Sequence, residues 1–272
     1  MSQQVVLITG ASSGIGKETA RIFLENNHIV YGTARRVEQM LDLKKQGAHI
    51  QYADISDENS VRQLVDGIIQ EQGKIDILVN NAGYGTYGAI EDVPLSEARK
   101  QFNVNVFGLA QLTQLVLPYM RAQKFGKIIN ISSVAGKTHT PLGGWYHASK
   151  HAVEGLSDCL RFETQPFGID VIIIEPGLIA TEWDGIALDS ATTYSGTSSY
   201  KHYIAGLKQL FSNMKPAHPQ LIANIIYKSS QVRKPKTRYV AGYGAKPLLR
   251  FKRFISDALF DSIMRKIISK RS

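Results

Sequence analysis

The chain has 272 residues and a formal net charge of +9, with 43% hydrophobic and 20% charged residues. This length suits one α/β domain with a single large core, and the composition is typical of a water-soluble globular protein. It argues against a membrane-spanning helix, since no apolar run approaches the roughly 20 residues that a span needs. The chain also has no internal repeat and no low-complexity tract.

Cysteine usage and the first residues favour a cytoplasmic protein. Cys159 is the only cysteine, so no internal disulfide can form, and we expect it to be a small buried apolar residue. Met1–Gln4 leads directly into the apolar run Val5–Ile8, without the charged segment and cleavage site of a signal peptide. The glycosylation sequon that begins at Asn130 falls in a predicted buried strand, so we expect no glycan there.

Short β-branched runs alternate with longer helical segments. The predicted strands are Val5–Thr9, His28–Thr33, His49–Ala53, Ile75–Asn80, Lys127–Ser132 and Asp170–Glu175. The predicted helices are Gly16–Asn26, Val37–Gln46, Glu58–Gln72, Arg99–Gln123 and Tyr146–Phe167. The alternation predicts an α/β fold of the doubly wound Rossmann type, a parallel sheet in one domain over residues 1–272. Such sheets bind ligands at the carboxyl ends of their strands.

Two later segments differ in composition. Residues 178–215 include a polar stretch of small and aromatic residues, Asp189–Tyr200, which predicts a long, mobile excursion over the site rather than core. We expect it to form a substrate lid with helical content. From about residue 245 to 272 a basic helical extension is expected.

A glycine-rich turn, Thr9–Lys17, joins the first predicted strand to the first helix. Its three glycines let the backbone turn sharply and approach a pyrophosphate, which the free N–H groups at the helix start can bind. The cofactor-binding residues predicted in this turn are Gly10, Ser12, Ser13, Gly14, Ile15 and Gly16. The alternative is a tight turn without a ligand.

The end of the second strand bears on which nicotinamide cofactor binds. An NAD site has a carboxylate here for the ribose 2′-hydroxyl, whereas this chain has Ala34 followed by Arg35 and Arg36. A guanidinium pairs with a 2′-phosphate, which a carboxylate would repel. We therefore predict NADP(H), bound by Arg35 with help from the Ser12 hydroxyl. The alternative is that Arg35 only begins the next helix, and for Arg36 that is the favoured interpretation.

Tyr146-His147-Ala148-Ser149-Lys150 places a phenol and an ammonium four residues apart, on one face of a predicted helix. An ammonium lowers the pKa of a nearby phenol from about 10. Tyr146 is thus predicted to donate a proton to a carbonyl oxygen. His147 points away from this face, so we expect no catalytic role for it. The spacing alone is common, and the motifs around it decide its meaning.

These motifs resemble those of the short-chain dehydrogenase/reductase family over residues 1–181. The resemblance implies that Ser133 hydrogen-bonds the substrate oxygen and that Asn105, rather than Asn103, holds a water in a proton relay through Lys150. It also implies that Asp54 contacts the adenine, although a turn-capping role is the open alternative. The cofactor contacts that it implies are Asp54, Ile55, Asn81, Ala82, Gly83, Tyr146, Lys150, Pro176, Gly177 and Thr181.

The resemblance implies reversible hydride transfer between a nicotinamide and a secondary alcohol or ketone. The most similar branch contains NADP-linked hydroxysteroid and retinol dehydrogenases and acyl-lipid ketone reductases, so a hydrophobic substrate is expected. The alternative is a non-enzymatic cofactor-sensing or scaffold protein on the same fold, although such relatives generally lack the Tyr or the Lys. No metal is expected, because the seven histidines show no ligand spacing.

Positive charge is concentrated near the end of the chain, where residues 228–272 hold 13 Lys and Arg and only two Asp. One helical arc there carries Leu259, Phe260, Ile263, Met264 and Ile267, flanked by Arg265, Lys266 and Lys270. The favoured interpretation is a helix packed on the body, and the alternative is a helix that touches an anionic membrane. No nucleic-acid partner is expected. The short Asp-Gly-Gly strand that packs tetramers in the family is missing, which favours a homodimer through the two long helices.

Overall fold

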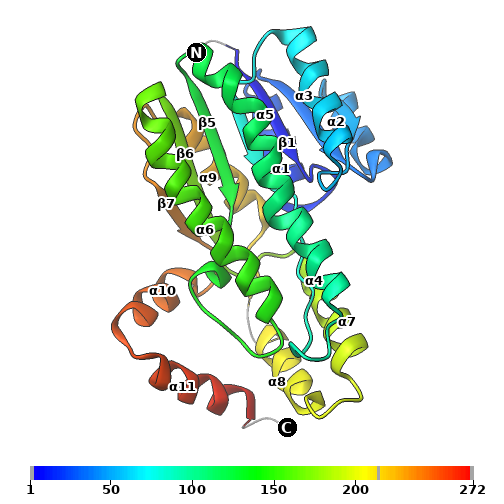
Figure 1. Cartoon of the computed structure of the whole chain (residues 1–272), viewed down its shortest axis with the longest axis vertical. Helices are drawn as coiled ribbons and strands as arrows, with labels where there is room; N and C mark the ends of the chain where they lie inside the picture. The colour runs from blue at the N-terminus through cyan, green and yellow to red at the C-terminus, as the bar shows by residue number, and fades with distance from the viewer. Residues whose placement is uncertain (1–2, 213–214, 270–272) are drawn as a thin grey trace.

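The computed structural model describes residues 3–212 and 215–269. Seven parallel strands form one sheet in the order β3-β2-β1-β4-β5-β6-β7 (Figure 1). The strands are β1 (Val5–Thr9), β2 (Ile29–Ala34), β3 (His49–Tyr52), β4 (Ile77–Asn80), β5 (Gly126–Ile131), β6 (Ile169–Pro176) and β7 (Arg238–Ala241). The predicted doubly wound Rossmann fold is confirmed, and its six predicted strands are present with shifts of one or two residues at some ends.

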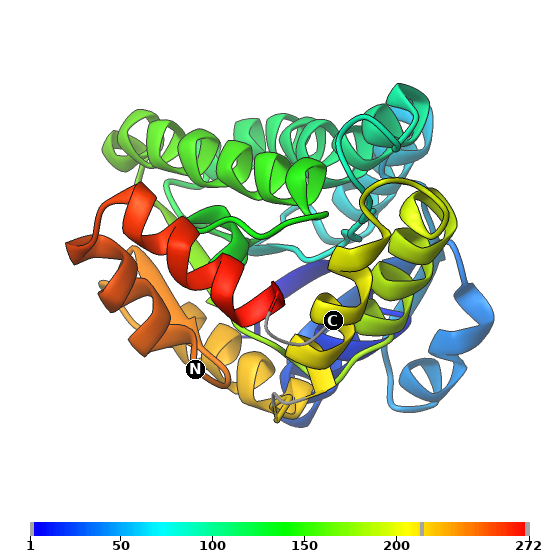
Figure 2. The same cartoon turned by 90° about the horizontal axis from the view of Figure 1, so that it is seen from below.

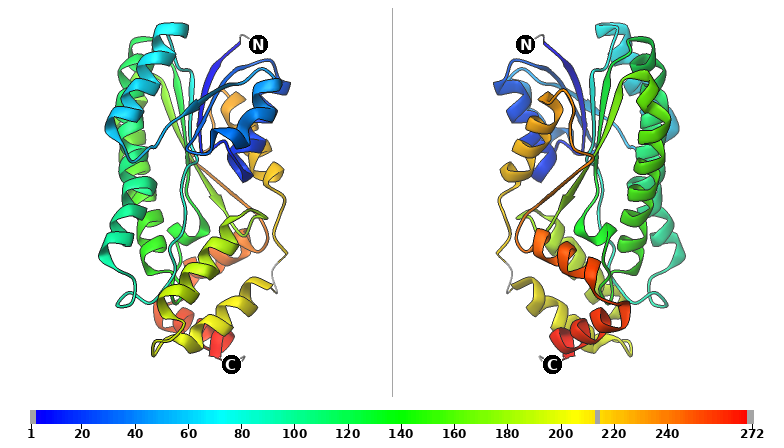
Figure 3. Two further views of the ribbon diagram at one scale, coloured as in Figure 1. Left: turned by 90° about the vertical axis from the view of Figure 1, so that its right-hand side faces the viewer. Right: turned by 90° about the vertical axis from the view of Figure 1, so that its left-hand side faces the viewer.

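Helices cover both faces of the sheet (Figure 3). One face carries α1 (Gly14–Glu25), α2 (Leu41–Lys45) and α9 (Pro219–Gln231), and the other carries α3 (Glu58–Gln72), α5 (Leu109–Ala122) and α6 (Gly144–Thr164). The strand β1 serves both layers: Val6 and Ile8 belong to the first core cluster, and Val5 and Leu7 to the second. Burial on both faces explains why its sequence is apolar without alternation.

The strand order reverses at β1. The chain runs outward from β1 to β2 and β3, then crosses back to β4 on the other side of β1. The chain leaves β1 and β4 toward helices on opposite faces of the sheet, which creates a crevice at the carboxyl ends of these strands, the usual ligand site of this architecture. Helix α1 starts at this crevice.

The predicted helix Arg99–Gln123 is interrupted in the structure. Helix α4 (Leu95–Phe102) passes through a π-helical turn, η2 (Asn103–Gly108), into α5. At Gly108 a Cβ atom would collide with the carbonyl oxygen of Ile55, so only glycine permits this close approach. Such π turns often occur at functional sites.

Residues 178–215 contain two helices, α7 (Trp183–Ser195) and α8 (Lys201–Ser212), while residues 213–214 lie outside the described part. The expectation that this segment is not core was wrong. Ala187 and Ala191 are fully buried in a third apolar cluster. Small residues four apart let α7 approach the loop after β4, where the hydroxyls of Ser190 and Ser195 accept hydrogen bonds from the backbone N–H groups of Tyr87 and Ala89, both at 2.8 Å.

The basic extension forms two helices, α10 (Ala245–Phe254) and α11 (Asp257–Ser269), and residues 270–272, including Lys270, lie outside the described part. Helix α11 packs on α8 (Figure 2). Phe260 and Ile268 are buried, whereas Leu259 and Ile267 of the predicted arc are exposed. The expectation that the apolar arc packs on the body is thus confirmed for part of the arc.

Two smaller expectations have different outcomes. Cys159 is exposed on α6, so the prediction that it is buried was wrong. Asn130 is fully buried in β5, where its side chain bonds Asn80 and Ser157. Among the helices of the described residues, none has the length and apolar character needed to cross a bilayer.

Candidate active site

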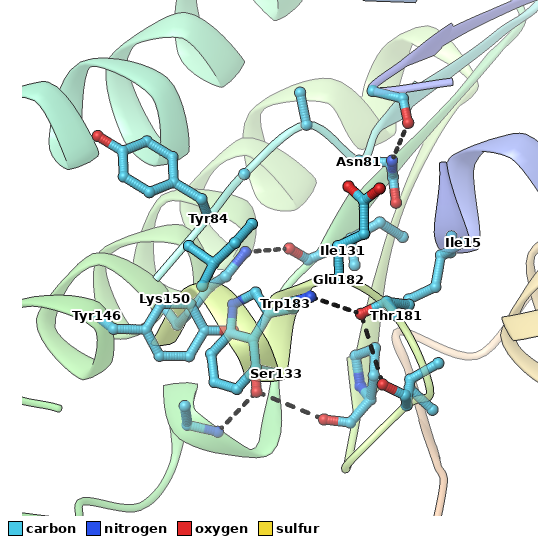
Figure 4. A pocket seen from close by; sticks show the side chains of 18 of the residues that line it. Ile15, Asn81, Tyr84, Ile131, Ser133, Tyr146, Lys150, Thr181, Glu182 and Trp183 are labelled. Carbon is cyan, nitrogen blue, oxygen red and sulfur yellow. Dashed lines mark hydrogen bonds between the residues drawn. The ribbon is translucent and has the colours of Figure 1, made fainter. Parts of the chain in front are cut away.

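The predicted motifs meet around one cavity of about 1070 Å³ at the carboxyl end of the sheet (Figure 4). Gly16 and Asn105 do not line it but lie behind its wall. The predicted site residues that line it are Gly10, Ser12, Ser13, Gly14, Ile15, Arg35, Asp54, Ile55, Asn81, Ala82, Gly83, Ser133, Tyr146, Lys150, Pro176, Gly177 and Thr181.

The glycine turn fits closely against the loop after β4. Gly10 and Gly14 have φ of 67° and 54°, a region that favours glycine. A Cβ on Gly16 would collide with the carbonyl oxygen of Gly10 and the amide of Asn81. That amide donates to the carbonyl oxygens of Thr9 and Gly10, at 2.9 and 3.2 Å. Within the part of the chain that the structure describes, no side chain caps the first turn of α1, so this turn presents a helix N-terminus to the cavity.

Both arginines after β2 are exposed and line the cavity. The backbone of Arg36 precedes the short helix η1 (Val37–Met40), as expected for a helix start. Its guanidinium nevertheless turns back over the cavity, where it pairs with Glu182 at 2.7 Å and donates to the Ser13 hydroxyl at 3.4 Å. Desolvation raises the pKa of the Asp54 carboxyl, but the hydrogen bonds from Ser56 and, to a smaller extent, the charge of Arg35 outweigh it, so that this pKa is lowered.

Asp54 has a local structural role in addition to its place in the cavity wall. Its Oδ1 accepts hydrogen bonds from the backbone N–H and the hydroxyl of Ser56, at 2.9 and 2.6 Å. The carboxylate that caps helix α3 belongs to Asp57 instead. A role of Asp54 in the turn therefore explains the contacts of its Oδ1. Contact with the adenine stays a prediction.

Tyr146 and Lys150 are both buried on the inner face of α6. The Lys150 ammonium donates to the carbonyl oxygen of Ile131 at 2.8 Å and lies 5.9 Å from the centre of the Tyr146 ring. Burial lowers the pKa of Lys150 to about 8, although Glu154 opposes the shift. Burial raises the pKa of Tyr146 to about 12, against a lowering effect of Ser133. Desolvation outweighs the effect of Ser133, so the pKa of Tyr146 is raised rather than lowered as the sequence predicted.

Ser133 begins the short helix η3 (Val134–Gly136) directly after β5. Its hydroxyl accepts from the backbone N–H of Ala135 at 3.1 Å and donates to the carbonyl oxygen of Pro176 at 3.5 Å. These contacts link the end of β5 to that of β6. They hold the hydroxyl beside the Tyr146 phenol, as Figure 4 shows.

Asn105 occupies the π turn and is 1% exposed, whereas Asn103 is exposed at the rim. Its amide donates to the carbonyl oxygen of Tyr84 and the hydroxyl of Ser149, at 2.9 and 3.0 Å, and its oxygen accepts from the Tyr84 N–H at 3.1 Å. A Cβ on Gly83 would lie 3.0 Å from this oxygen and 3.6 Å from the Lys150 nitrogen. Asn105 and Lys150 thus approach the same point from two helices.

His147 stabilises the loop beside the site. Its Nδ1 faces the carbonyl oxygens of Ala135 and Thr138, at 3.0 and 2.7 Å, and burial lowers its pKa to about 4. A neutral imidazole held in this way orients residues 135–138. The expectation that it takes no catalytic role is consistent with this geometry.

Comparison with known proteins identifies the family. The family model for short chain dehydrogenases matches residues 4–189. The chain belongs to this family. It is 37% identical over 278 residues to the NADPH-dependent 3-dehydrocapnine reductase of Ornithobacterium rhinotracheale, covering 97% of each chain. It is 47% identical over 177 residues to the 3-ketodihydrosphingosine reductase of Bacteroides thetaiotaomicron, covering 65% of this chain and 64% of the relative.

A solved short-chain dehydrogenase from Streptomyces avermitilis has the same fold, with a TM-score of 0.81, 30% identity and 97% coverage of both chains. The protein is therefore an oxidoreductase of the short-chain dehydrogenase family, whose reactions interconvert alcohols and carbonyl groups.

The sequence did not predict the aromatic wall of the cavity beside Tyr146. The ring centres of Tyr87 and Trp183 lie 6.0 and 5.0 Å from that of Tyr146, and the ring of Phe211 packs on both of them. Tyr87 comes four residues after Gly83, the last residue of Asn80-Asn81-Ala82-Gly83, and Trp183 comes two residues after Thr181. Their positions directly after strand-end motifs are the only sequence signal for them. Ile186, Leu210 and Leu248 extend the apolar wall.

Proposed function

We propose that this protein is an NADP(H)-dependent reductase that acts on a ketone in a long apolar molecule. The observation that carries the proposal is the meeting of Ser133, Tyr146 and Lys150 on the cavity wall opposite a glycine turn. Oxidation of the corresponding alcohol is the reverse of the same reaction.

The residues present fit a dinucleotide phosphate. The turn at Gly10, Gly14 and Gly16 has no room for side chains and ends at an uncapped helix N-terminus, which suits a pyrophosphate. Arg35 and Ser12 at its open end suit a 2′-phosphate. The remaining predicted contacts, from Asp54, Ile55, Asn81–Gly83, Pro176, Gly177 and Thr181, are part of this proposal. When bound, the nicotinamide supplies the hydride.

The side chains act on the carbonyl oxygen. With its pKa near 12, the phenol of Tyr146 is protonated at neutral pH, so it is a proton donor ready for reduction. The hydroxyl of Ser133 orients the substrate oxygen. Lys150 is held by the carbonyl of Ile131, and a water held between it and Asn105 would return a proton to Tyr146.

The substrate class rests on two supports. The cavity beside Tyr146 is walled by large aromatic and aliphatic side chains, which favours an apolar chain over a small polar ketone. Two relatives are a 3-ketodihydrosphingosine reductase and an NADPH-dependent 3-dehydrocapnine reductase. We therefore propose a long-chain ketone of a lipid as the substrate.

A NADPH-oxidation assay with a panel of ketones tests the proposal. Long-chain lipid ketones are expected to be reduced, with steroid and retinoid carbonyls and short ketones as comparison classes. NADPH oxidation with no member of the panel would contradict the proposal and favour a non-enzymatic, cofactor-binding role.

A homodimer in the cytoplasm is the expected setting. Exposed apolar side chains on the outer sides of η2 and α6, among them Phe107 and Phe162 at 62% and 73% exposure, support a dimer through these helices. Light scattering during size-exclusion chromatography measures the dimer directly.

A further inference from the structure

The outer side of helix α10 combines aromatic and basic residues. Phe254 is 80% exposed and Phe251 is 46% exposed. Helical spacing places Lys246, Arg250 and Arg253 on the same side as Phe254, with Phe251 at its edge. We call these five residues the α10 face. Large exposed aromatic side chains flanked by cations are typical of helices that lie at a membrane surface.

The positive charge of this face is not compensated. Both carboxylates of the extension are engaged elsewhere: Asp257 pairs with Lys252, and Asp261 pairs with His139 at 2.7 Å. Lys252 itself lies 4.8 Å from the ring of Phe260, between α10 and α11. Lys246, Arg250 and Arg253 form no ion pair within residues 3–212 and 215–269. The face therefore presents three cations to the solvent.

The opposite side of the same helix forms part of the cavity wall. Ala245 and Leu248 line the cavity, together with Tyr243 and Gly244 just before α10. The α10 face is thus one helix diameter away from the space proposed for the substrate. A partner that binds the α10 face therefore lies close to the cavity.

We propose that the α10 face docks the protein on an anionic lipid surface, from which a long-chain ketone enters the cavity. The entry of a long-chain ketone rests on the proposed function, whereas the docking does not. The two phenyl rings insert among the acyl chains, and the three cations attract the anionic headgroups. A second copy of the chain fits this face poorly, because a symmetric contact would bring three cations against three.

This surface differs from the one that the sequence indicated. The apolar arc of α11 is largely used in packing, since Phe260 is buried and Ile263 and Met264 are half-buried. Deletion of residues 245–272 would therefore remove part of the lid and of the cavity wall as well as the docking surface. Point substitutions on α10 avoid this problem.

Co-sedimentation with vesicles tests the docking without substrate or cofactor. The full chain is mixed with vesicles of phosphatidylcholine alone, or of phosphatidylcholine and phosphatidylglycerol in equal parts. Binding to the mixed vesicles and its decrease with added salt are expected. F251S/F254S and R250E/R253E are each expected to lower partitioning by about tenfold or more.

Helix α2 offers matched controls at the other end of the molecule (Figure 1), with an exposed leucine and two exposed lysines. Leu41→Ser and K44E/K45E should bind the mixed vesicles as the unchanged chain does. No binding by the unchanged chain, or equal losses in the α2 and α10 variants, would overturn the proposal. Equal binding to both vesicle types would overturn the role of the cations.

Activity on two forms of substrate separates this inference from the proposed function. F251S/F254S should reduce a water-soluble ketone as the unchanged chain does, but lose activity on a ketone presented in mixed vesicles. If no ketone is reduced while vesicle binding persists, the proposed function fails and the docking stands.

Discussion

The crevice at β1 and β4 faces a cover across one cavity, and the two differ in what determines their residues. The cover is formed by α7, α8 and α10, with α11 packed on α8. In the crevice, backbone atoms approach so closely that only glycine fits at Gly16, and Asn81 must bond two particular carbonyls. In the cover, apolar side chains fill space, and other apolar residues of similar size would fill it too.

The difference indicates where chemistry and specificity lie. Under the proposed function, close backbone packing holds the cofactor, which all substrates share. Side-chain packing then sets the shape of the space for the substrate. Changes in the crevice should therefore affect every substrate, and changes in the cover should affect some substrates more than others.

The largest effect is expected for Tyr146→Phe. Loss of the proton donor should lower kcat by about 10²–10⁴-fold while NADPH binding, followed by fluorescence, persists. Tyr87→Phe is the matched control, because it removes a neighbouring buried phenol whose ring centre lies 6.0 Å away. Similar losses in the two variants would mean that packing, rather than the Tyr146 proton, limits the rate.

A smaller effect is expected at the open end of the crevice. Arg35→Asp should reverse the preference between NADPH and NADH, shifting the ratio of kcat/KM values by about tenfold to a hundredfold, since a charge-assisted contact is lost. Arg36→Asp is the control, because that guanidinium is paired with Glu182. An unchanged ratio in Arg35→Asp would contradict the assignment of Arg35 to the 2′-phosphate.

The cover is tested by Trp183→Ala. Removal of this ring should raise KM for a long-chain ketone by about tenfold, through lost apolar contact, and change the kinetics of a short ketone much less. The two substrates compared in one variant provide the control. Equal losses for both would show that Trp183 positions Tyr146 rather than the chain of the substrate.

The smallest effect concerns neither the crevice nor the cover but a cluster between α6, β6 and β7, where Glu175 and Glu154 are buried beside Arg238. Burial, together with the neighbouring Glu154, raises the pKa of Glu175 to about 7 from 4.5. The folded state therefore binds this proton more tightly, and stability should decrease as the pH rises from about 4.5 to 7.

Glu175→Gln removes this titration. Its melting temperature, compared with that of the unchanged chain between pH 5 and pH 8, should improve by a few degrees toward the upper end. Glu163→Gln, which changes an exposed carboxylate of α6, is the control. A constant difference between the variant and the unchanged chain over this range would contradict the raised pKa.

The same contrast explains what the sequence could predict. The glycine turn and Asn80–Gly83 are recognisable because few residues satisfy their geometry, and they give the otherwise common Tyr146–Lys150 spacing its meaning. Helix α7 was not recognised as core because its buried positions are alanines and serines, which are as common in loops. The short edge strand β7 begins with Arg238, which is atypical of a strand interior. The pKa of Tyr146 depends on burial by Trp183 and Tyr87, which no local motif encodes.

One contact in the cover has a mechanical consequence. At Gly206 of α8 a Cβ would collide with the backbone of Ile268, so the two helices touch there backbone to backbone. Because α8 is packed this closely on α11, we expect the two helices to move together when the cavity opens. Amide hydrogen exchange would detect them as one unit. Residues 201–212 and 257–269 should exchange at matched rates, and both should exchange more slowly when a substrate is bound.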